Sequence, residues 1–277
     1  MTTPTWPTVR VAVSAESVDW VSGELWAWGC TGIAEEPMSD DTVTLVAGFP
    51  SFADAEAAAL AVSGTCVVVD GADWLDAWRE HFEPLRVGAL LIAPSWKIVD
   101  ATTERGETRI DLDPGRAFGT GAHASTRLAL ALLQHIPVDG VSLLDVGCGS
   151  GVLSVAAARL GAAKVTGIDI EDEAVRVTNE NAVRNGVAER VRVSTQRLEA
   201  LDGPFDVVVA NILAPVLIEL APAIAAHVGA TLILAGLIED QVGRVLAAYP
   251  QLTLVERIDE PPWVGLLLSA RVDLAQP

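Results

Sequence analysis

The sequence predicts an α/β protein in which a Rossmann-like, seven-stranded sheet follows a smaller N-terminal α+β domain of ferredoxin-like topology. The first observation is a strand, a glycine turn, a helix and a second strand within residues 143–169. The second is an alternation of apolar runs with helical patterns from residue 141 onward, which closes with two successive strands. The third is the order strand, helix, strand, strand, helix, strand in the first 70 residues.

Hydrophobic periodicity predicts the N-terminal elements. One face of the first helix is apolar every three to four residues, at Val18, Val21, Leu25 and Trp28. Ser51 is a candidate N-cap for an alanine-rich second helix. The expected elements are a strand at 8–14, a helix at 15–28, strands near Ile33 and at 42–49, a helix at 52–62 and a strand at 65–69.

Aromatic residues mark the connection between the two domains. Seven of the eight tryptophans lie in residues 6–96, and we interpret them as core and inter-domain packing in preference to a ligand cage. Trp74, Trp78 and Phe82 share one face of a short expected helix that ends before Pro84. The chain is therefore expected to contain an N-terminal domain, a linker helix with its connector and a C-terminal domain, at residues 1–72, 73–94 and 95–277.

The stretch FGTGAHAST at residues 118–126 fits neither a strand nor a helix pattern. It follows expected strands at 89–92 and 108–112 and precedes a helix that Ser125 or Thr126 could cap. Its hydroxyls and glycines, including Gly119 and Thr120, suit the polar end of a ligand, although such loops are commonly plain turns. We interpret His123 as a structural hydrogen-bonding residue in preference to a base.

A glycine turn stands at the centre of the C-terminal domain. The apolar run 141–146 predicts a buried strand that stops at Gly147, Gly149 and Gly151. A helical pattern and a second buried strand follow, and Asp169 stands at the carboxyl end of that strand. This order is typical of a βαβ nucleotide-binding unit.

The glycine spacing separates the possible ligands. A dinucleotide-binding turn needs two residues before its third glycine, whereas Gly151 follows Gly149 after only one, and no phosphate-binding lysine follows. We therefore expect an adenosine-containing ligand without a pyrophosphate, with Asp169 on its ribose hydroxyls. The turn resembles motif I of S-adenosylmethionine-dependent methyltransferases, with Asp145 as the leading acid. The alternative is a glycine-rich turn in an unrelated α/β domain.

Three residues stand at the ends of expected parallel strands, namely Gly147, Asp169 and Asn211, and the fold would bring them together. The amide oxygen of Asn211 can accept a hydrogen bond from an attacking amine, although an N-cap role is the alternative. The remaining expected elements are a helix at 171–185, strands at 190–194 and 206–210, a helix after Pro215, a strand at 231–235, a helix at 239–248 and strands at 252–257 and 264–270.

Composition limits the classes of function. The chain has 277 residues, is 51% apolar, and contains no apolar run long enough for a membrane helix or a signal peptide, so we expect a cytoplasmic protein. Its three cysteines are far apart and no metal site is expected. A net charge of −19 opposes direct nucleic-acid binding. In residues 1–73 Arg10 is the only base against eleven acids, which fits either a basic partner or a generally acidic proteome.

Five stretches together resemble one family, the ribosomal protein L-eleven methyltransferases. The matching stretches occur in the order and at the spacing of that family, and they are WLDAWREHFEPLRVGALLIAPSW at 74–96, LDPGRAFGTGAHAST at 112–126, LLDVGCGSGVL at 143–153, GIDI at 167–170 and VVANILA at 208–214. The resemblance extends over about the last 200 residues. The family usually has THPTT around the loop histidine, where this chain has AHAST at 122–126.

The resemblance implies an N-terminal substrate-recognition domain, a linker and a class I methyltransferase domain whose last strand is antiparallel. It implies S-adenosyl-L-methionine as cofactor, a basic ribosomal protein as substrate, and a monomer that binds no nucleic acid or membrane. It places Asn211 beside the amine as the catalytic residue. Cofactor contacts fall on Gly119, Thr120, Thr126, Gly147, Gly149, Asp169 and Asn211. The alternatives are a lysine methyltransferase of the same fold that acts on another protein, such as the electron-transfer flavoprotein enzymes, or a non-catalytic cofactor-binding regulator or adapter.

Overall fold

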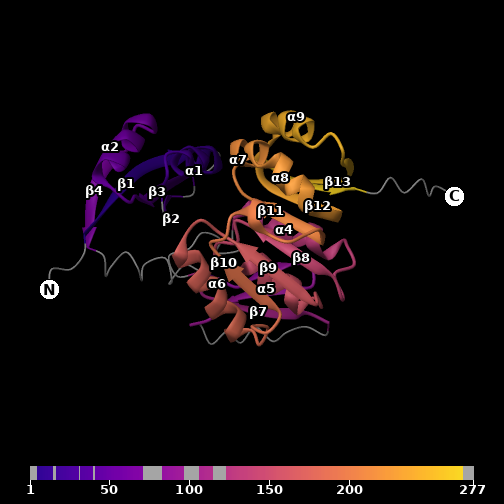
Figure 1. The fold of residues 1–277 in the computed structure, drawn as a ribbon. Coiled ribbons are helices and arrows are strands. Elements are labelled where there is room, and N and C mark those ends of the chain that lie inside the picture. Colours follow the sequence, from indigo (N-terminus) through magenta and orange to yellow (C-terminus); the bar gives the residue numbers. More distant parts are fainter. Residues whose placement is uncertain are drawn as a thin grey trace. The chain divides into compact units, whose positions relative to one another are not determined.

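The computed structural model describes residues 5–14, 17–30, 32–39, 41–70, 83–96, 106–114 and 123–270. The chain divides into two compact units, Met1–Phe82 and Glu83–Pro277, each with its own sheet (Figure 1). The expected linker helix with Trp74 and Trp78, and the loop residues Gly119 and Thr120, lie outside the described residues.

In its described residues, the N-terminal unit is a four-stranded antiparallel sheet with two helices. Its strands lie in the order β2-β3-β1-β4, so that β1 pairs with both β3 and β4. Ser51 caps the second helix as the sequence predicts, because its side chain accepts the backbone N–H of Asp54 at 3.2 Å. In chain order the elements are β1 (Thr5–Ser14), α1 (Val18–Ala27), β2 (Gly32–Ser39), β3 (Thr42–Gly48), α2 (Phe52–Ala61) and β4 (Thr65–Asp70).

The core of this unit contains fewer tryptophans than the sequence suggests. Leu25, Leu45 and Phe49 are fully buried, and small alanines of α2 pack close to the sheet. Trp20 and Trp28 are 62% and 45% exposed, so these two side chains do not lie in the core of this unit, and their part in inter-domain packing stays a prediction. Burying Val21 and Leu25 on one face of α1 turns their neighbours toward the other faces of the helix.

The second unit begins with a small sheet in the order β5-β6-β7, formed by β5 (Leu85–Val87), β6 (Leu90–Pro94) and β7 (Thr108–Leu112). The last residue of helix α4 (Ala124–Gln134) binds the hairpin formed by β5 and β6. The Gln134 side chain accepts the N–H of Ala89 at 2.8 Å and donates to the carbonyl of Val87 at 3.0 Å. The expected strand at 89–92, which the sequence analysis placed in the connector, therefore belongs to the second unit.

The main sheet has seven strands in the order β10-β9-β8-β11-β12-β14-β13, which confirms the predicted α/β sheet. The first five pair in parallel and β14 is antiparallel to both of its neighbours. The order reverses between β8 and β11, which creates a switch point at their carboxyl ends. The strands are β8 (Ser142–Val146), β9 (Lys164–Ile168), β10 (Val191–Ser194), β11 (Phe205–Asn211), β12 (Val228–Ile238), β13 (Thr253–Glu260) and β14 (Trp263–Ser269).

Two groups of helices pack against this sheet. Helix α4 contacts β12, β14 and α5 (Val152–Arg159), and α5 contacts α6 (Asp172–Arg184). The second group consists of α7 (Ala214–Glu219), α8 (Ala221–His227) and α9 (Glu239–Ala248). Because crossovers between parallel strands are right-handed as a rule, we expect the two groups to cover opposite faces of the sheet. Among the described residues, no helix combines the length and apolar character that a membrane crossing requires.

Candidate functional site

The glycine turn at the end of β8 is closely packed by two other elements. Gly147, Gly149 and Gly151 have φ angles of 75°, 52° and 78°, a region that other residues rarely adopt. A Cβ atom on Gly147 would lie 2.4 Å from the Cγ2 atom of Ile212, and one on Gly151 would lie 2.5 Å from that of Thr178. Both positions therefore require glycine, for backbone conformation and for space.

Asp169 lies against this turn immediately after β9. One of its carboxylate oxygens accepts the backbone N–H of Gly149 at 2.9 Å, and the other accepts that of Glu171 at 3.1 Å. The next residue, Ile170, is 96% exposed although its side chain is large and apolar. The sequence analysis did not choose Ile170 as a site residue. Its position directly after Asp169, the predicted ribose-binding acid, could have indicated it.

Asn211 and Thr126 meet at the end of β11, although 85 residues separate them in the chain. The Asn211 amide nitrogen donates to the Thr126 hydroxyl at 3.2 Å. The Asn211 amide oxygen is buried and has no hydrogen-bond partner within the described residues. A buried acceptor without a partner costs roughly 1–3 kcal/mol, so this oxygen is suited to receive a donor from a bound molecule.

His123 is the N-cap of α4, whereas the sequence analysis assigned that role to Ser125 or Thr126. Its Nδ1 atom accepts the backbone N–H of Ser125 at 3.3 Å and contacts the Ser125 hydroxyl at 2.8 Å. Its ring meets that of Trp263 edge-on, with centroids 4.5 Å apart. Burial, assisted by Arg127, lowers the pKa of His123 to about 4. A neutral capping imidazole fits the structural role that the sequence analysis favoured.

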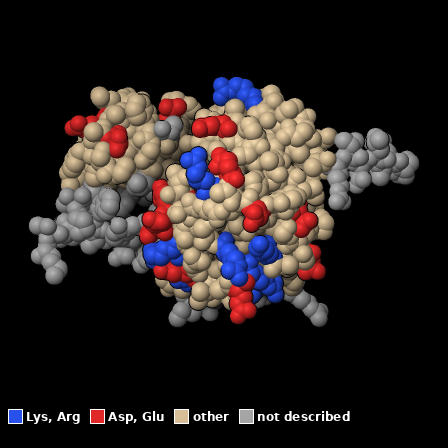
Figure 2. Space-filling view, viewed as in Figure 1, with Lys and Arg blue, Asp and Glu red and all other residues tan. Residues whose placement is uncertain are grey.

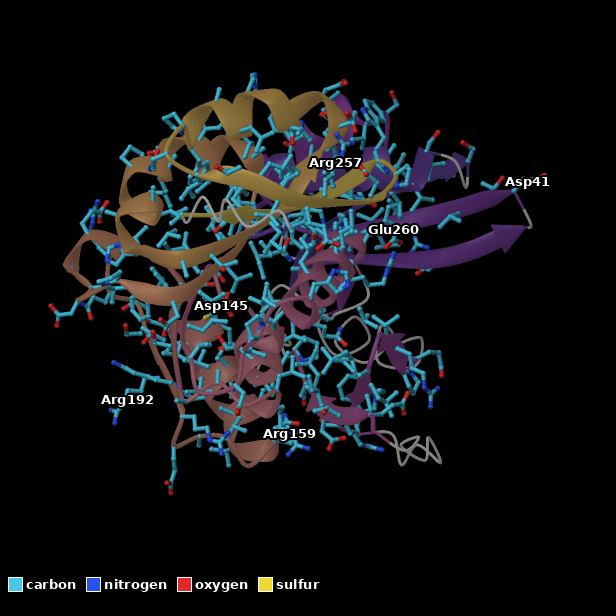
Figure 3. The ribbon with its side chains drawn as sticks, turned by 90° about the vertical axis from the view of Figure 1, so that its right-hand side faces the viewer. Asp41, Asp145, Arg159, Arg192, Arg257 and Glu260 are labelled. Atoms are coloured by element: carbon cyan, nitrogen blue, oxygen red, sulfur yellow. The ribbon has the colours of Figure 1, made fainter. Side chains whose placement is uncertain are left out.

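Asp145 lies inside the second unit beneath the glycine turn (Figure 3). One oxygen accepts the Ser154 hydroxyl at 2.6 Å, and the other has no partner among the described residues. Burial raises the pKa of Asp145 to about 7, the hydrogen bond from Ser154 opposes this rise, and the charge of Asp169 adds to it. The raised pKa keeps a large part of the buried Asp145 carboxyl neutral near pH 7.

Several ionisable groups of the second unit form pairs on its surface. Figure 2 shows acidic and basic side chains interspersed on the visible face of that unit. Arg176, for example, pairs with Glu173 and Glu180 on one face of α6. Exposed pairs of this kind contribute at most about 1 kcal/mol each. Within the described residues, no group of three or more His, Cys, Asp or Glu side chains could hold a metal ion.

Comparisons with known proteins give one family. The family model described as Ribosomal protein L11 methyltransferase (PrmA) matches residues 49–271. A ribosomal protein L11 methyltransferase of Citrifermentans bemidjiense is 46% identical over 205 residues, which cover 71% of this chain and 66% of the relative. One of Pelotomaculum thermopropionicum is 46% identical over 200 residues, which cover 70% of this chain and 64% of the relative. The matched part therefore spans just under two thirds of these relatives.

A solved structure agrees with these matches. The crystal structure of a ribosomal protein L11 methylase from Lactobacillus delbrueckii subsp. bulgaricus aligns with a TM-score of 0.63 at 32% identity. The alignment covers 68% of this chain and 98% of that one.

We expect Asp145→Asn to change the pH dependence of stability. The pKa of Asp145 rises from 3.8 to about 7 on folding, so folding takes up a proton between these values. As the pH rises through that window, the free energy of unfolding of the wild type should fall by up to about 1.4 kcal/mol per pH unit. Outside the window, Asp145 should add no pH dependence to the stability. The variant should lack this fall in denaturant titrations at several pH values. Parallel curves for the two proteins would contradict the prediction.

Proposed function

The chain belongs to the ribosomal protein L11 methyltransferase family, and we propose that it transfers methyl groups from S-adenosyl-L-methionine to lysine or N-terminal amines of ribosomal protein L11. The observation that carries the proposal is the meeting of the glycine turn, Asp169, Thr126 and Asn211 at the carboxyl ends of three neighbouring parallel strands. This is the edge of an open α/β sheet where ligands bind.

The described residues fit an adenosine ligand with a positively charged sulfur. Gly147 and Gly151 let the turn adopt positive φ angles and pack directly against Ile212 and Thr178, so the protein itself holds the turn backbone that would face the cofactor. Asp169 would accept hydrogen bonds from the ribose hydroxyls, and the exposed Ile170 would cover one face of the adenine ring. The carboxyl groups of Asp145 and Asp169 would complement the cationic part. When bound, S-adenosyl-L-methionine supplies a methyl group on a sulfonium that is ready for displacement.

Asn211 would orient the substrate amine. Its bond to Thr126 fixes the amide so that the amide oxygen remains the unpaired acceptor. An N–H of the amine would satisfy this oxygen and turn the nitrogen lone pair toward the methyl group. Lysine has an unperturbed pKa of about 10.4 and must be neutral to attack, so a site with acceptors and little water would favour the reactive form. Positioning then supplies much of the rate.

We assign substrate recognition to residues 1–72, a linker helix and connector to 73–94, and methyl transfer to 95–277. The strand order β2-β3-β1-β4 with two helices supports a ferredoxin-like fold for the first domain. Its surface carries acidic side chains (Figure 2), which favours a basic ribosomal protein as partner. The enzyme would act as a monomer in the cytoplasm, without binding nucleic acid directly.

The test of this function is transfer of label from S-adenosyl-L-methionine to purified ribosomal protein L11. We expect the wild type to label L11, and Asn211→Ala to lower kcat by about a hundredfold because the amine loses its positioning acceptor. The affinity for the cofactor should change much less than kcat. Label on a different protein from a ribosomal extract would support another substrate, and cofactor binding without any transfer would support a regulator.

Asp169→Ala should weaken cofactor binding by about a hundredfold, because hydrogen bonds to a charged acceptor contribute roughly 1.5–3 kcal/mol. Calorimetry with S-adenosylhomocysteine measures the effect. Asp172→Ala is the matched control, because Asp172 is an acid in the first turn of α6 with no contact to the glycine turn among the described hydrogen bonds. Equal affinities of Asp169→Ala and the wild type would contradict the ribose assignment.

Deletion of residues 1–72 should leave cofactor affinity within about twofold, because every cofactor contact proposed here lies in the second unit, which has its own sheets and core. Methylation of L11 should be lost. Transfer assays and calorimetry on the shortened chain measure both effects. Full methylation of L11 by the shortened chain would show that recognition lies elsewhere.

A further inference from the structure

Helix α6 carries a row of buried polar side chains that the proposed chemistry does not use. Thr178 and Asn181 are completely buried, and Asn185, which follows the helix, is 8% exposed. Their spacing of three and four residues puts them on one side of the helix. Buried polar side chains normally form hydrogen bonds with other buried groups. The partners of these three side chains therefore show which segments they hold together.

Both the nitrogen and the oxygen of the Asn181 side-chain amide form two hydrogen bonds. Its nitrogen donates to the carbonyl of Asp113 at 2.9 Å and to the carbonyl of Ser150 at 2.8 Å. Its oxygen accepts the N–H of Asp113 at 3.0 Å and a hydrogen bond from Arg184. Asp113 follows β7, and Ser150 lies inside the glycine turn. Asn181 therefore joins the end of the small sheet to the centre of the turn.

Thr178 holds the adjacent peptide of the same turn. Its hydroxyl donates to the carbonyl of Gly149 at 3.0 Å, and its methyl group occupies the space beside Gly151. Helix α6 thus binds two successive carbonyls of the turn, Gly149 and Ser150. Because the C=O and N–H of a trans peptide point in opposite directions, holding a carbonyl also fixes the direction of the following N–H.

We propose that Asn181 is a positioning residue that holds the glycine turn in its cofactor-binding conformation. This inference rests on the proposed function. Only an amide of this length supplies two donors and an acceptor here, because aspartate lacks the N–H groups and leucine lacks all three. Without Asn181 the carbonyl of Ser150 loses a buried hydrogen-bond donor, and the turn can adopt other conformations. Because a smaller fraction of the protein then has the binding conformation, the affinity for the cofactor falls.

Asn185 is a matched control for this role. It pairs with Asp111 as Asn181 pairs with Asp113, accepting the N–H and donating to the C=O, both at 2.8 Å. None of the hydrogen bonds described for Asn185 reaches the glycine turn. Loss of either amide removes a two-bond link to β7, but only Asn181 links β7 to the turn. A difference between the two variants therefore separates positioning from stability.

The experiment compares full-length Asn181→Ala and Asn185→Ala with the wild type, by calorimetry with S-adenosylhomocysteine, denaturant titration and transfer kinetics. We expect both variants to lose stability. Only Asn181→Ala should raise Kd and the KM for the cofactor, by about tenfold or more, with kcat at saturation close to the wild type. Thr178→Val, which keeps the side-chain shape, should also raise Kd and serves if Asn181→Ala does not fold. Equal values of Kd for the Asn181 and Asn185 variants, or an unchanged Kd for Thr178→Val, would overturn the proposal.

Backbone hydrogen exchange of residues 147–152 without cofactor tests the same idea independently of the function. We expect faster exchange in Asn181→Ala than in Asn185→Ala, and equal rates would overturn the proposal. If the wild type binds no S-adenosylhomocysteine, the proposed function fails, whereas this exchange comparison still decides whether Asn181 holds the turn.

Discussion

The close packing of the glycine turn is the constraint on which the rest of the second unit depends. Gly147 faces Ile212 beyond β11, and Gly151 faces Thr178 on α6, each without room for a Cβ atom. The turn therefore brings together the end of the central strand, the following crossover and the helix after β9. A change of backbone here would move Asp169 and Asn211 with respect to each other, since each is placed by an element that packs on the turn.

Some buried polar atoms around this turn have hydrogen-bond partners within the protein, and others have none among the described residues. The first kind supports the structure, and the second kind is suited to bind a ligand or substrate. The amides of Asn181 and Asn185 are satisfied by backbone groups, so their role is complete in the protein alone. One oxygen of Asn211 and one of Asp145 have no partner among the described residues. Leaving such atoms unpaired opposes folding by roughly 1–3 kcal/mol each, and a bound ligand or substrate that donates to the Asn211 oxygen would recover part of it.

The two units are built differently, in a way that supports the two tasks proposed for them. In the main sheet of the second unit, the parallel strands β8 and β11 are largely buried, which would hold the groups at their carboxyl ends rigidly. The first unit is a small antiparallel sheet with large apolar side chains such as Trp20 and Leu60 exposed and acids on its surface. Under the proposed division of tasks, the first unit would supply the contact area that a protein substrate needs outside the reaction site.

The sequence alone determined the order of most helices and strands, the seven-stranded sheet and the place of Gly147, Asp169 and Asn211 at strand ends, because hydrophobic periodicity and glycine spacing are local signals. It did not predict the short strand β5, and it predicted one helix after Pro215 where the structure has α7 and α8. Only the tertiary structure decided which side chains meet. The contact of Thr126 with Asn211 spans 85 residues, and that of Asn181 with Asp113 spans 68. The capping role of His123 and the exposure of Trp20 were likewise hidden, because burial and hydrogen-bond partners depend on how elements distant in sequence pack together.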